Sequence, residues 1–169
     1  MGIQKRLWIA MVVLGASSRL LPHPWNFTPL MALGLFAGNK AQKTSTGVFV
    51  TLAALALSDA VMGFYSGFWY VYAAALVPVL LGRLVRERGI GALAGAAVAS
   101  SASFFLITNF MVWATTQLYP HTAAGLTGCY AAGLPFYQNQ ALGDVFYTVG
   151  IFGGYAAISH VVRQRQQAA

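Results

Sequence analysis

Charged residues are scarce in this sequence. Only 8% of its 169 residues are charged and 58% are hydrophobic, whereas a soluble domain carries about 25% charged residues. So few charges cannot cover the surface of a water-soluble globule, and the composition therefore predicts an integral membrane protein. The single cysteine, Cys129, excludes an internal disulfide and a cysteine-based metal cluster. A lone cysteine in an apolar segment is typical of plain packing.

The motifs of common catalytic and nucleotide-binding sites are also missing. The sequence has no GxxxxGK[ST], HExxH or GxSxG run, so it lacks a P-loop for ATP and gives no sign of a zinc protease or a serine hydrolase. We therefore predict no cofactor, no metal and no catalytic residue, and we expect the chain not to be an enzyme. The net charge of +7 does not indicate nucleic-acid binding, because most basic residues flank apolar runs.

What the sequence does contain is a series of apolar segments. A membrane-spanning helix needs about 20 residues, and the later segments approach or exceed that length. The first two reach it only with polar flanking residues, or else they break before crossing. We predict an all-α, polytopic membrane protein, a single domain built as a compact bundle of six transmembrane helices. Their expected ranges are 7–21, 28–38, 47–64, 69–84, 90–115 and 144–162.

The basic residues predict the orientation of the bundle. Lys and Arg are enriched in cytoplasmic loops. With six helices and a cytoplasmic N-terminus, nine of the ten basic residues fall inside and only Arg19 falls outside. Five or seven helices would break this alternation, so both termini are expected in the cytoplasm. A cleaved signal peptide at the start is disfavoured, because its removal would spoil the pattern.

Two segments are rich in small residues. Gly91, Gly95, Ala99 and Ser103 recur at four-residue spacing, and we expect this face to pack inside the bundle, since small residues let helices approach closely. The uncharged segment 121–140 is expected to lie in an outer loop before the last helix. Its composition favours a lid or a re-entrant helix slightly over an ordinary interfacial loop.

Polar residues gather at the outer ends of the expected helices. An unpaired charge near the bilayer centre costs about 2.5–3.5 kcal/mol, so we expect Arg19 to pair with Asp59 or Asp144. Such a pair either staples helices, contacts a ligand, or does both. The three prolines of "PHPWNFTP" cannot continue a helix and predict a rigid, extended loop over the outer mouth.

These side chains predict a small-molecule site. A pocket lined by aromatic rings with a few convergent polar groups is typical of one, although Tyr and Trp also form interfacial belts. The candidate binding residues are Arg19, His23, Asn26, Asp59, Trp69, Asn109, Trp113, Tyr130 and Asp144.

The runs "RLLPHPWNFTP", "LSDAVMGFY", "FFLITNFMVW", "YPHTAAGLTGCYAAGLPF" and "LGDVFYT" carry a resemblance. Together they resemble a family of bacterial integral membrane proteins described as transport proteins. That family is similar to the substrate-binding S components of energy-coupling-factor (ECF) transporters. The resemblance implies capture of a vitamin-like solute, with a membrane scaffold and separate ATPases supplying energy. The alanine-x-x-x-alanine docking face of S components is not matched, because Leu14 follows Ala10 at that spacing.

We therefore predict a multi-pass protein of the inner (plasma) membrane, in contact with the lipid bilayer, that binds a small organic solute for uptake. One alternative is an intramembrane enzyme that uses the same outer cluster. Another is a non-transporting subunit of a membrane complex.

Overall fold

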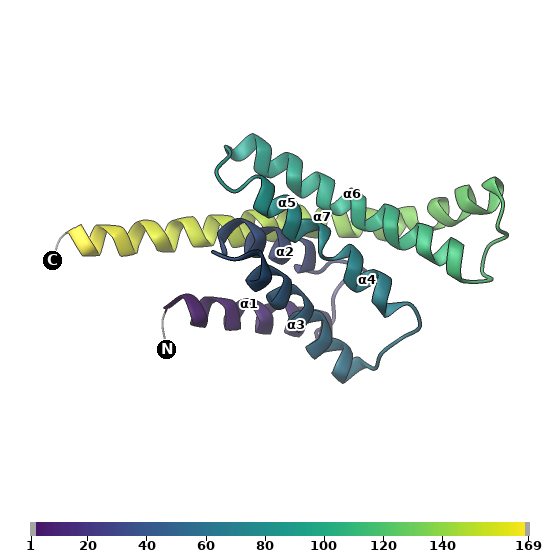
Figure 1. Cartoon of the computed structure of the whole chain (residues 1–169), viewed down its shortest axis with the longest axis horizontal. Helices are drawn as coiled ribbons and strands as arrows, with labels where there is room; N and C mark the ends of the chain where they lie inside the picture. Colours follow the sequence, from purple (N-terminus) through teal and green to yellow (C-terminus); the bar gives the residue numbers. More distant parts are fainter. Residues whose placement is uncertain (1–2, 168–169) are drawn as a thin grey trace.

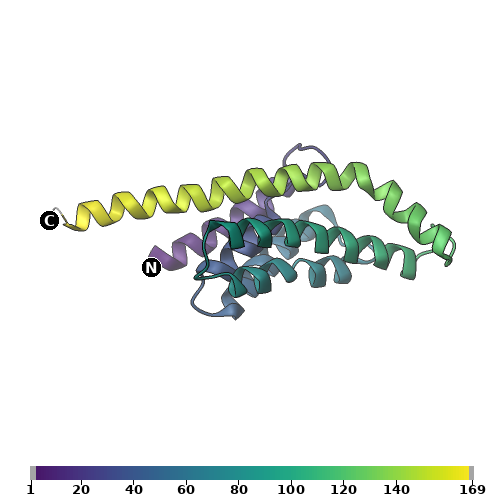
Figure 2. The ribbon, with the colours of Figure 1, turned by 90° about the horizontal axis from the view of Figure 1, so that it is seen from above.

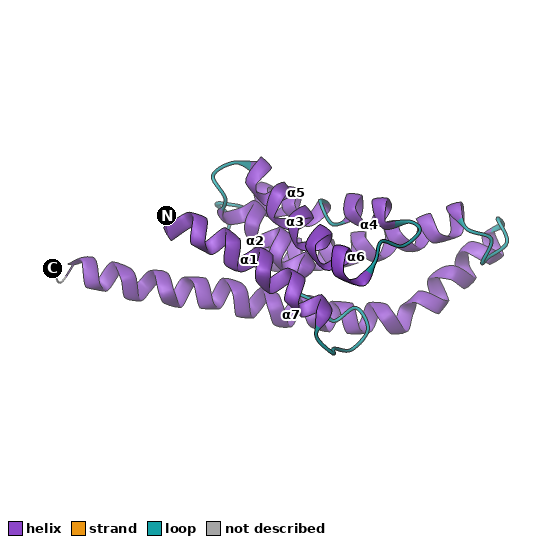
Figure 3. Ribbon diagram, turned by 90° about the horizontal axis from the view of Figure 1, so that it is seen from below, coloured by secondary structure: helices purple, strands orange, loops and turns teal. Residues whose placement is uncertain are grey.

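The computed structural model describes residues 3–167, and those residues form helices and loops with no strand (Figure 3). The all-α prediction is confirmed. The helices are α1 (Ile3–Leu20), α2 (Leu30–Lys40), α3 (Thr44–Met62), α4 (Phe68–Ala74), α5 (Val77–Leu84), α6 (Ile90–Thr115) and α7 (Ala123–Gln167).

Successive helices run in alternate directions along one long axis, so both termini lie at the same end of the molecule (Figures 1 and 2). Helices α4 and α5 together make one run, interrupted at residues 75–76 just before Pro78. The expected helix over 69–84 is thus present but broken. Proline at the second position of α5 is tolerated there, because the first turn of a helix has no partner for that amide.

Among residues 3–167, three helices are long and apolar enough to cross a membrane: α3, α6 and α7. This finding indicates membrane association. At 1.5 Å per residue, the 45 residues of α7 extend about 67 Å, roughly twice the hydrocarbon thickness of a bilayer. The predicted range of 90–115 for α6 is confirmed.

Helix α7 corrects the expected start of the last helix at Asp144. It begins at Ala123 and contains Pro135, so segment 121–140 is mostly helical, and from residue 123 to 140 it is continuous with the last helix. Figure 2 shows that α7 bends in its first part. Proline removes one main-chain hydrogen bond and kinks a helix without ending it when neighbouring helices support the backbone.

Helix α2 lies at the centre of the bundle. Ten of its eleven residues are buried, and it packs against α1, α3, α5, α6 and α7. Its approach to α5 depends on glycine: a Cβ on Gly38 would lie 2.0 Å from the Val79 carbonyl oxygen, and one on Gly82 would lie 2.1 Å from that of Leu35. At 11 residues, α2 is about 16 Å long and does not cross a bilayer by itself.

The expected small-residue packing face of α6 is wrong. Gly91, Gly95 and Ala99 are exposed, and a Cβ on either glycine would meet nothing within 4 Å. The buried residues of α6 are Ala96, Ser100 and Ser101. Because α6 is apolar on all sides, the sequence pattern does not distinguish its inward face from its outward face.

Candidate functional site

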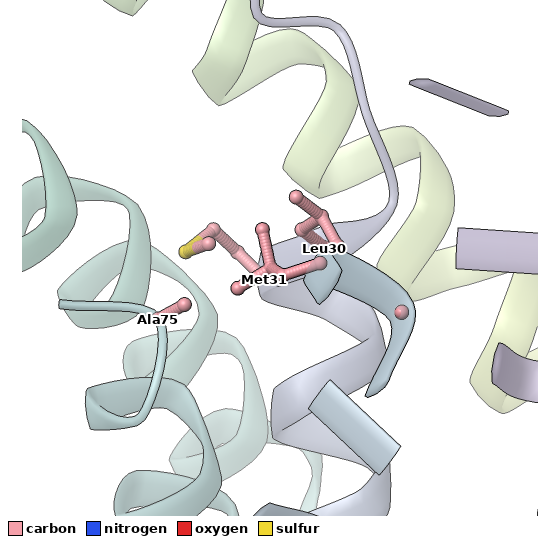
Figure 4. Packing of buried hydrophobic residues seen from close by; sticks show 5 residues of the cluster. Leu30, Met31 and Ala75 are labelled. Carbon is pink, nitrogen blue, oxygen red and sulfur yellow. The ribbon is translucent and has the colours of Figure 1, made fainter. Parts of the chain in front are cut away.

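A cavity of about 640 Å³ lies where the C-terminal parts of α1, α3 and α6 meet the start of α2. Its walls come from α1, α2, α3, α4, α6, α7 and the loops 21–29 and 63–67. Part of its lining is apolar, with Leu30 and Met31 at the start of α2 and Leu55 on α3. These three residues belong to one buried cluster with Ala75. Figure 4 shows Leu30, Met31 and Ala75 close together.

An ion pair lies beside this cavity. Arg19 Nη1 is 2.6 Å from Asp59 Oδ1, with the Arg19 side chain 13% exposed and that of Asp59 fully buried. The expected pairing of Arg19 with Asp59 is confirmed. The two oxygens of Asp59 have different partners. Oδ2 accepts a hydrogen bond of 2.9 Å from the Tyr72 hydroxyl. Oδ1 contacts Arg19 Nη1 only as an ion pair, without the geometry of a hydrogen bond.

Arg19 lines the cavity, and Asp59 pairs with the Arg19 guanidinium without lining the cavity itself. The guanidinium also donates from Nη1 to the Leu55 carbonyl (3.3 Å) and to the Ser58 hydroxyl. All of these contacts use Nη1. The Nη2 and Nε donors are therefore available to a bound molecule, and the ion pair fixes the direction in which they point.

Asp144 lines the same cavity from α7. It is 3% exposed, and its Oδ2 atom has no hydrogen-bond partner among the described residues. The side chains of Ser101 and Gln140 lie beside its carboxyl group, and Gln140 Nε2 donates to the Ser101 carbonyl at 2.9 Å. A buried carboxyl oxygen without a donor is costly, so a polar group of a ligand would stabilise it.

The loop 21–29 forms the rim of the cavity. It is not helical, as expected, but it is not fully extended, because Phe27 N donates to the Pro24 carbonyl at 3.0 Å and closes a turn. Asn26 has φ of 62°, a left-handed conformation that asparagine tolerates better than most residues. His23, Trp25 and Asn26 all line the cavity.

The loop is anchored by aromatic contacts to α7. The Phe27 ring lies 5.9 Å from that of Phe146 and 5.5 Å from that of Tyr147, while Trp25 packs edge-on against Phe136 at 6.0 Å. Across the mouth, burial and then the charge of Asp59 raise the pKa of Tyr65. Its hydroxyl therefore stays protonated and can donate a hydrogen bond.

Asn109 lies in a smaller neighbouring cavity of about 180 Å³ between α6 and α7. The two cavities share lining residues, among them Asn26, Thr108 and Gln140. Asn109 Nδ2 donates to the Phe105 carbonyl at 2.9 Å, which leaves its Oδ1 close to Gly133, where a Cβ would lie 2.6 Å away.

The three expected aromatic walls do not line either cavity. Trp69 is 55% exposed and packs on Tyr70, which does line the larger cavity. Trp113 Nε1 donates to the Pro120 carbonyl at 2.9 Å, and the Tyr130 hydroxyl donates to the Leu106 carbonyl at 3.0 Å. Trp113 thus ties α6 to the loop before α7, and Tyr130 ties the start of α7 to α6. The aromatic side chains at the larger cavity are those of Trp25, Tyr65, Tyr70 and Phe104.

Cys129 is buried, and its thiol donates to the Asn109 carbonyl at 3.3 Å. Within residues 3–167, no group of three or more His, Cys, Asp or Glu side chains is arranged to hold a metal ion.

Sequence reasoning missed Gln140 and Thr108, and it did not assign Tyr72 a role. Gln140 precedes Asp144 by four residues, so both lie on one face of a helix. The four-residue spacing is visible in "QALGD". It predicts a shared helix face only if residue 140 lies in the helix, whereas the sequence pattern places it in a loop.

One protein family matches this chain over residues 2–167, with the description "Family of unknown function (DUF6580)". The chain belongs to DUF6580. No curated protein and no solved structure matches the chain. The function of this DUF6580 member is therefore inferred from its cavities.

Proposed function

We propose that this chain binds a small organic solute in the 640 Å³ cavity and takes part in its uptake. The observation that carries the proposal is that one cavity is lined both by Arg19, whose side-chain contacts all use Nη1, and by Asp144, whose buried Oδ2 atom has no hydrogen-bond partner among the described residues. A volume of about 640 Å³ lies within the range of roughly 300–1,000 Å³ for small-molecule sites.

The chemistry of the lining limits the class of solute. Arg19 favours a carboxylate, a phosphate or another acceptor group, since guanidinium donors match planar anions. Asp144 favours an N–H or O–H donor on another part of the same molecule. Between them, Leu30, Met31 and Phe104 suit an apolar or aromatic body. We therefore propose an amphoteric, vitamin-like solute with both an acceptor and a donor group.

The proposal includes the orientation of the chain. Six helical runs, with α4 and α5 counted as one, would lie in the inner membrane with both termini in the cytoplasm. The short helix α2 would complete its passage only together with the non-helical residues on either side of it. This arrangement follows the excess of basic residues at the end that carries the termini, and it opens the cavity to the outside. Because the sequence has no P-loop, energy for uptake would come from a separate membrane scaffold with ATPases.

The test is mass spectrometry of small molecules released from the detergent-purified chain. We expect about one molecule per chain in the wild type and a loss in Arg19→Lys, which keeps the charge beside Asp59 but removes the planar fork. Asp144→Asn is nearly isosteric and should also lower occupancy. Arg83→Lys is the matched control, because Arg83 lines neither cavity at this end and bonds the Ala41 and Gln42 carbonyls.

Each variant is first checked for helical content and a single size-exclusion peak. Loss of the molecule in the folded Arg19→Lys and Asp144→Asn variants, with retention in Arg83→Lys, supports the proposal. Equal retention in all four proteins contradicts it. Release of a chemically altered molecule over time would instead favour an intramembrane enzyme.

A further inference from the structure

A second cavity, of about 630 Å³, lies at the start of α6, whereas the solute cavity lies against the later part of that helix. It is bordered by the end of α2, the loop 85–89, the start of α6 and the last part of α7. Its basic lining residues are Lys40, Arg86, Arg88, His160 and Arg163.

No acidic residue lines this basic cavity, and the ion pair found within residues 3–167 is the distant one between Arg19 and Asp59. An excess of Lys and Arg is ordinary at one membrane face. Here, however, four Lys and Arg side chains from three elements line one concave site. Like charges in a shared cavity repel one another, so a general excess of basic residues does not by itself account for this arrangement. Glu87 lies between Arg86 and Arg88 in the loop 85–89 but does not line the cavity, so the lining itself carries no counter-charge.

Helix α6 adds to the positive potential of this site. Gly89, its N-terminal cap residue, and Ile90, its first residue, both line the cavity. No side chain caps this end of the helix. The positive end of the helix dipole therefore faces the same space as the four cationic side chains.

An apolar groove continues from the basic cavity along the bundle. It has a volume of about 840 Å³ and lies between α1 and α7. Its walls include Leu7, Trp8 and Met11 of α1 and Ile151 and Ile158 of α7.

The groove and the basic cavity share four lining residues, Lys40, Tyr155, Ser159 and Arg163. Lys40 Nζ marks the junction, 5.6 Å from the centre of the Tyr155 ring and 5.9 Å from that of Phe152. A basic site that opens into an apolar groove matches a molecule with an anionic head and a hydrocarbon tail.

We propose that an anionic phospholipid binds here, with its phosphate headgroup in the basic cavity and an acyl chain along the groove between α1 and α7. Basic pockets between transmembrane helices hold such headgroups in other membrane proteins. A soluble phosphate shares the headgroup chemistry, but it leaves the groove empty. This site is separate from the solute cavity and does not depend on that proposal.

The first experiment removes charge. Binding of phosphatidylglycerol and of phosphatidylcholine with the same acyl chains is titrated by native mass spectrometry of the detergent-purified chain. We compare Arg86→Gln/Arg88→Gln with Lys5→Gln/Arg165→Gln, which removes the same charge from residues that line neither the cavity nor the groove. Loss of one charge-assisted hydrogen bond to a phosphate weakens binding roughly tenfold, so the cavity pair should weaken phosphatidylglycerol binding at least tenfold, and the control pair much less.

The second experiment fills the groove without changing charge. Gly154 lines the groove and Gly153 does not, and a Cβ on either one meets nothing within 4 Å. Both Gly153→Phe and Gly154→Phe should therefore fold. We expect Gly154→Phe to weaken phosphatidylglycerol binding at least tenfold, and Gly153→Phe to leave it unchanged. Binding of glycerol 3-phosphate should be insensitive to both substitutions.

The outcomes separate the proposal from its competitors. Selective loss in the cavity pair and in Gly154→Phe, with both controls near wild type, supports a phospholipid site. An equal effect of the two charge pairs would show diffuse attraction to the membrane surface and would overturn the proposal. Glycerol 3-phosphate binding as tight as lipid binding, with Gly154→Phe unaffected, would also overturn it in favour of a soluble anion.

Discussion

Arg19–Asp59 is the ion pair found among residues 3–167, and Asp59→Asn tests its contribution to stability. Asp59 is fully buried and Arg19 is 13% exposed, so the substitution leaves a guanidinium without its counter-charge in an apolar bundle. Breaking a buried pair in this way costs about 3–5 kcal/mol. That is a large share of a typical folding free energy of about 5–15 kcal/mol.

Removing both charges should cost less than removing one. Arg19→Met/Asp59→Leu eliminates the buried guanidinium as well as the carboxylate, and hydrophobic replacements of buried pairs are often close to neutral. The Tyr72 hydroxyl then loses its acceptor, which costs about 1–3 kcal/mol. We therefore expect the double variant to be more stable than Asp59→Asn by roughly 2 kcal/mol.

The assay is the free energy of unfolding of the purified chain, measured by titration with a denaturing detergent, with Arg83→Met as an exposed-arginine control. Solute occupancy is measured on the same samples. We expect the double variant to recover stability without recovering the solute, because Arg19 itself lines the cavity. A loss below about 1 kcal/mol in Asp59→Asn, or a double variant less stable than the single one, would refute the reasoning.

Three further substitutions test the packing of α2 on α5 and the hydrogen bond from Tyr72 to Asp59, again by the free energy of unfolding. Gly38→Ala should destabilise the chain by about 1–3 kcal/mol, since its Cβ would lie 2.0 Å from the Val79 carbonyl oxygen. Gly91→Ala is the control, because its Cβ would meet open space, and it should stabilise the chain by up to about 1 kcal/mol. Equal changes in the free energy of unfolding for Gly38→Ala and Gly91→Ala would contradict the close approach of α2 and α5. Tyr72→Phe should cost about 1.5–3 kcal/mol, because a hydrogen bond to a charged group is lost, and no loss would mean that the hydroxyl does not serve Asp59.

The bounds of a helix were predictable where a long apolar run ends at clear breaks in the sequence. The range of α6 follows from a long, mostly apolar run without charge or proline between Gly89 and Thr116. The start of α7 did not follow, because Pro135 and the small residues before it suggest a loop when read locally. Packing against α6, which no local pattern shows, keeps that segment helical.

The candidate site was predictable in its charges and not in its aromatic walls. Charged groups are so few in an apolar chain that Arg19 and Asp59 have little alternative to pairing. Trp69, Trp113 and Tyr130 were placed at the correct end, but their side chains do not line the cavities. Helices that are apolar on all sides carry no periodicity that tells which face is inward.

The most direct test of solute binding is to fill the cavity without altering any of its polar groups. Val112 lines the cavity from α6, whereas Val98 is 64% exposed elsewhere on the same helix. The measurement is the number of small molecules released per chain from folded wild type, Val112→Trp and Val98→Trp. We predict about one in the wild type and in Val98→Trp and close to none in Val112→Trp. A wild type that releases none, or equal release from all three proteins, would contradict solute binding in this cavity.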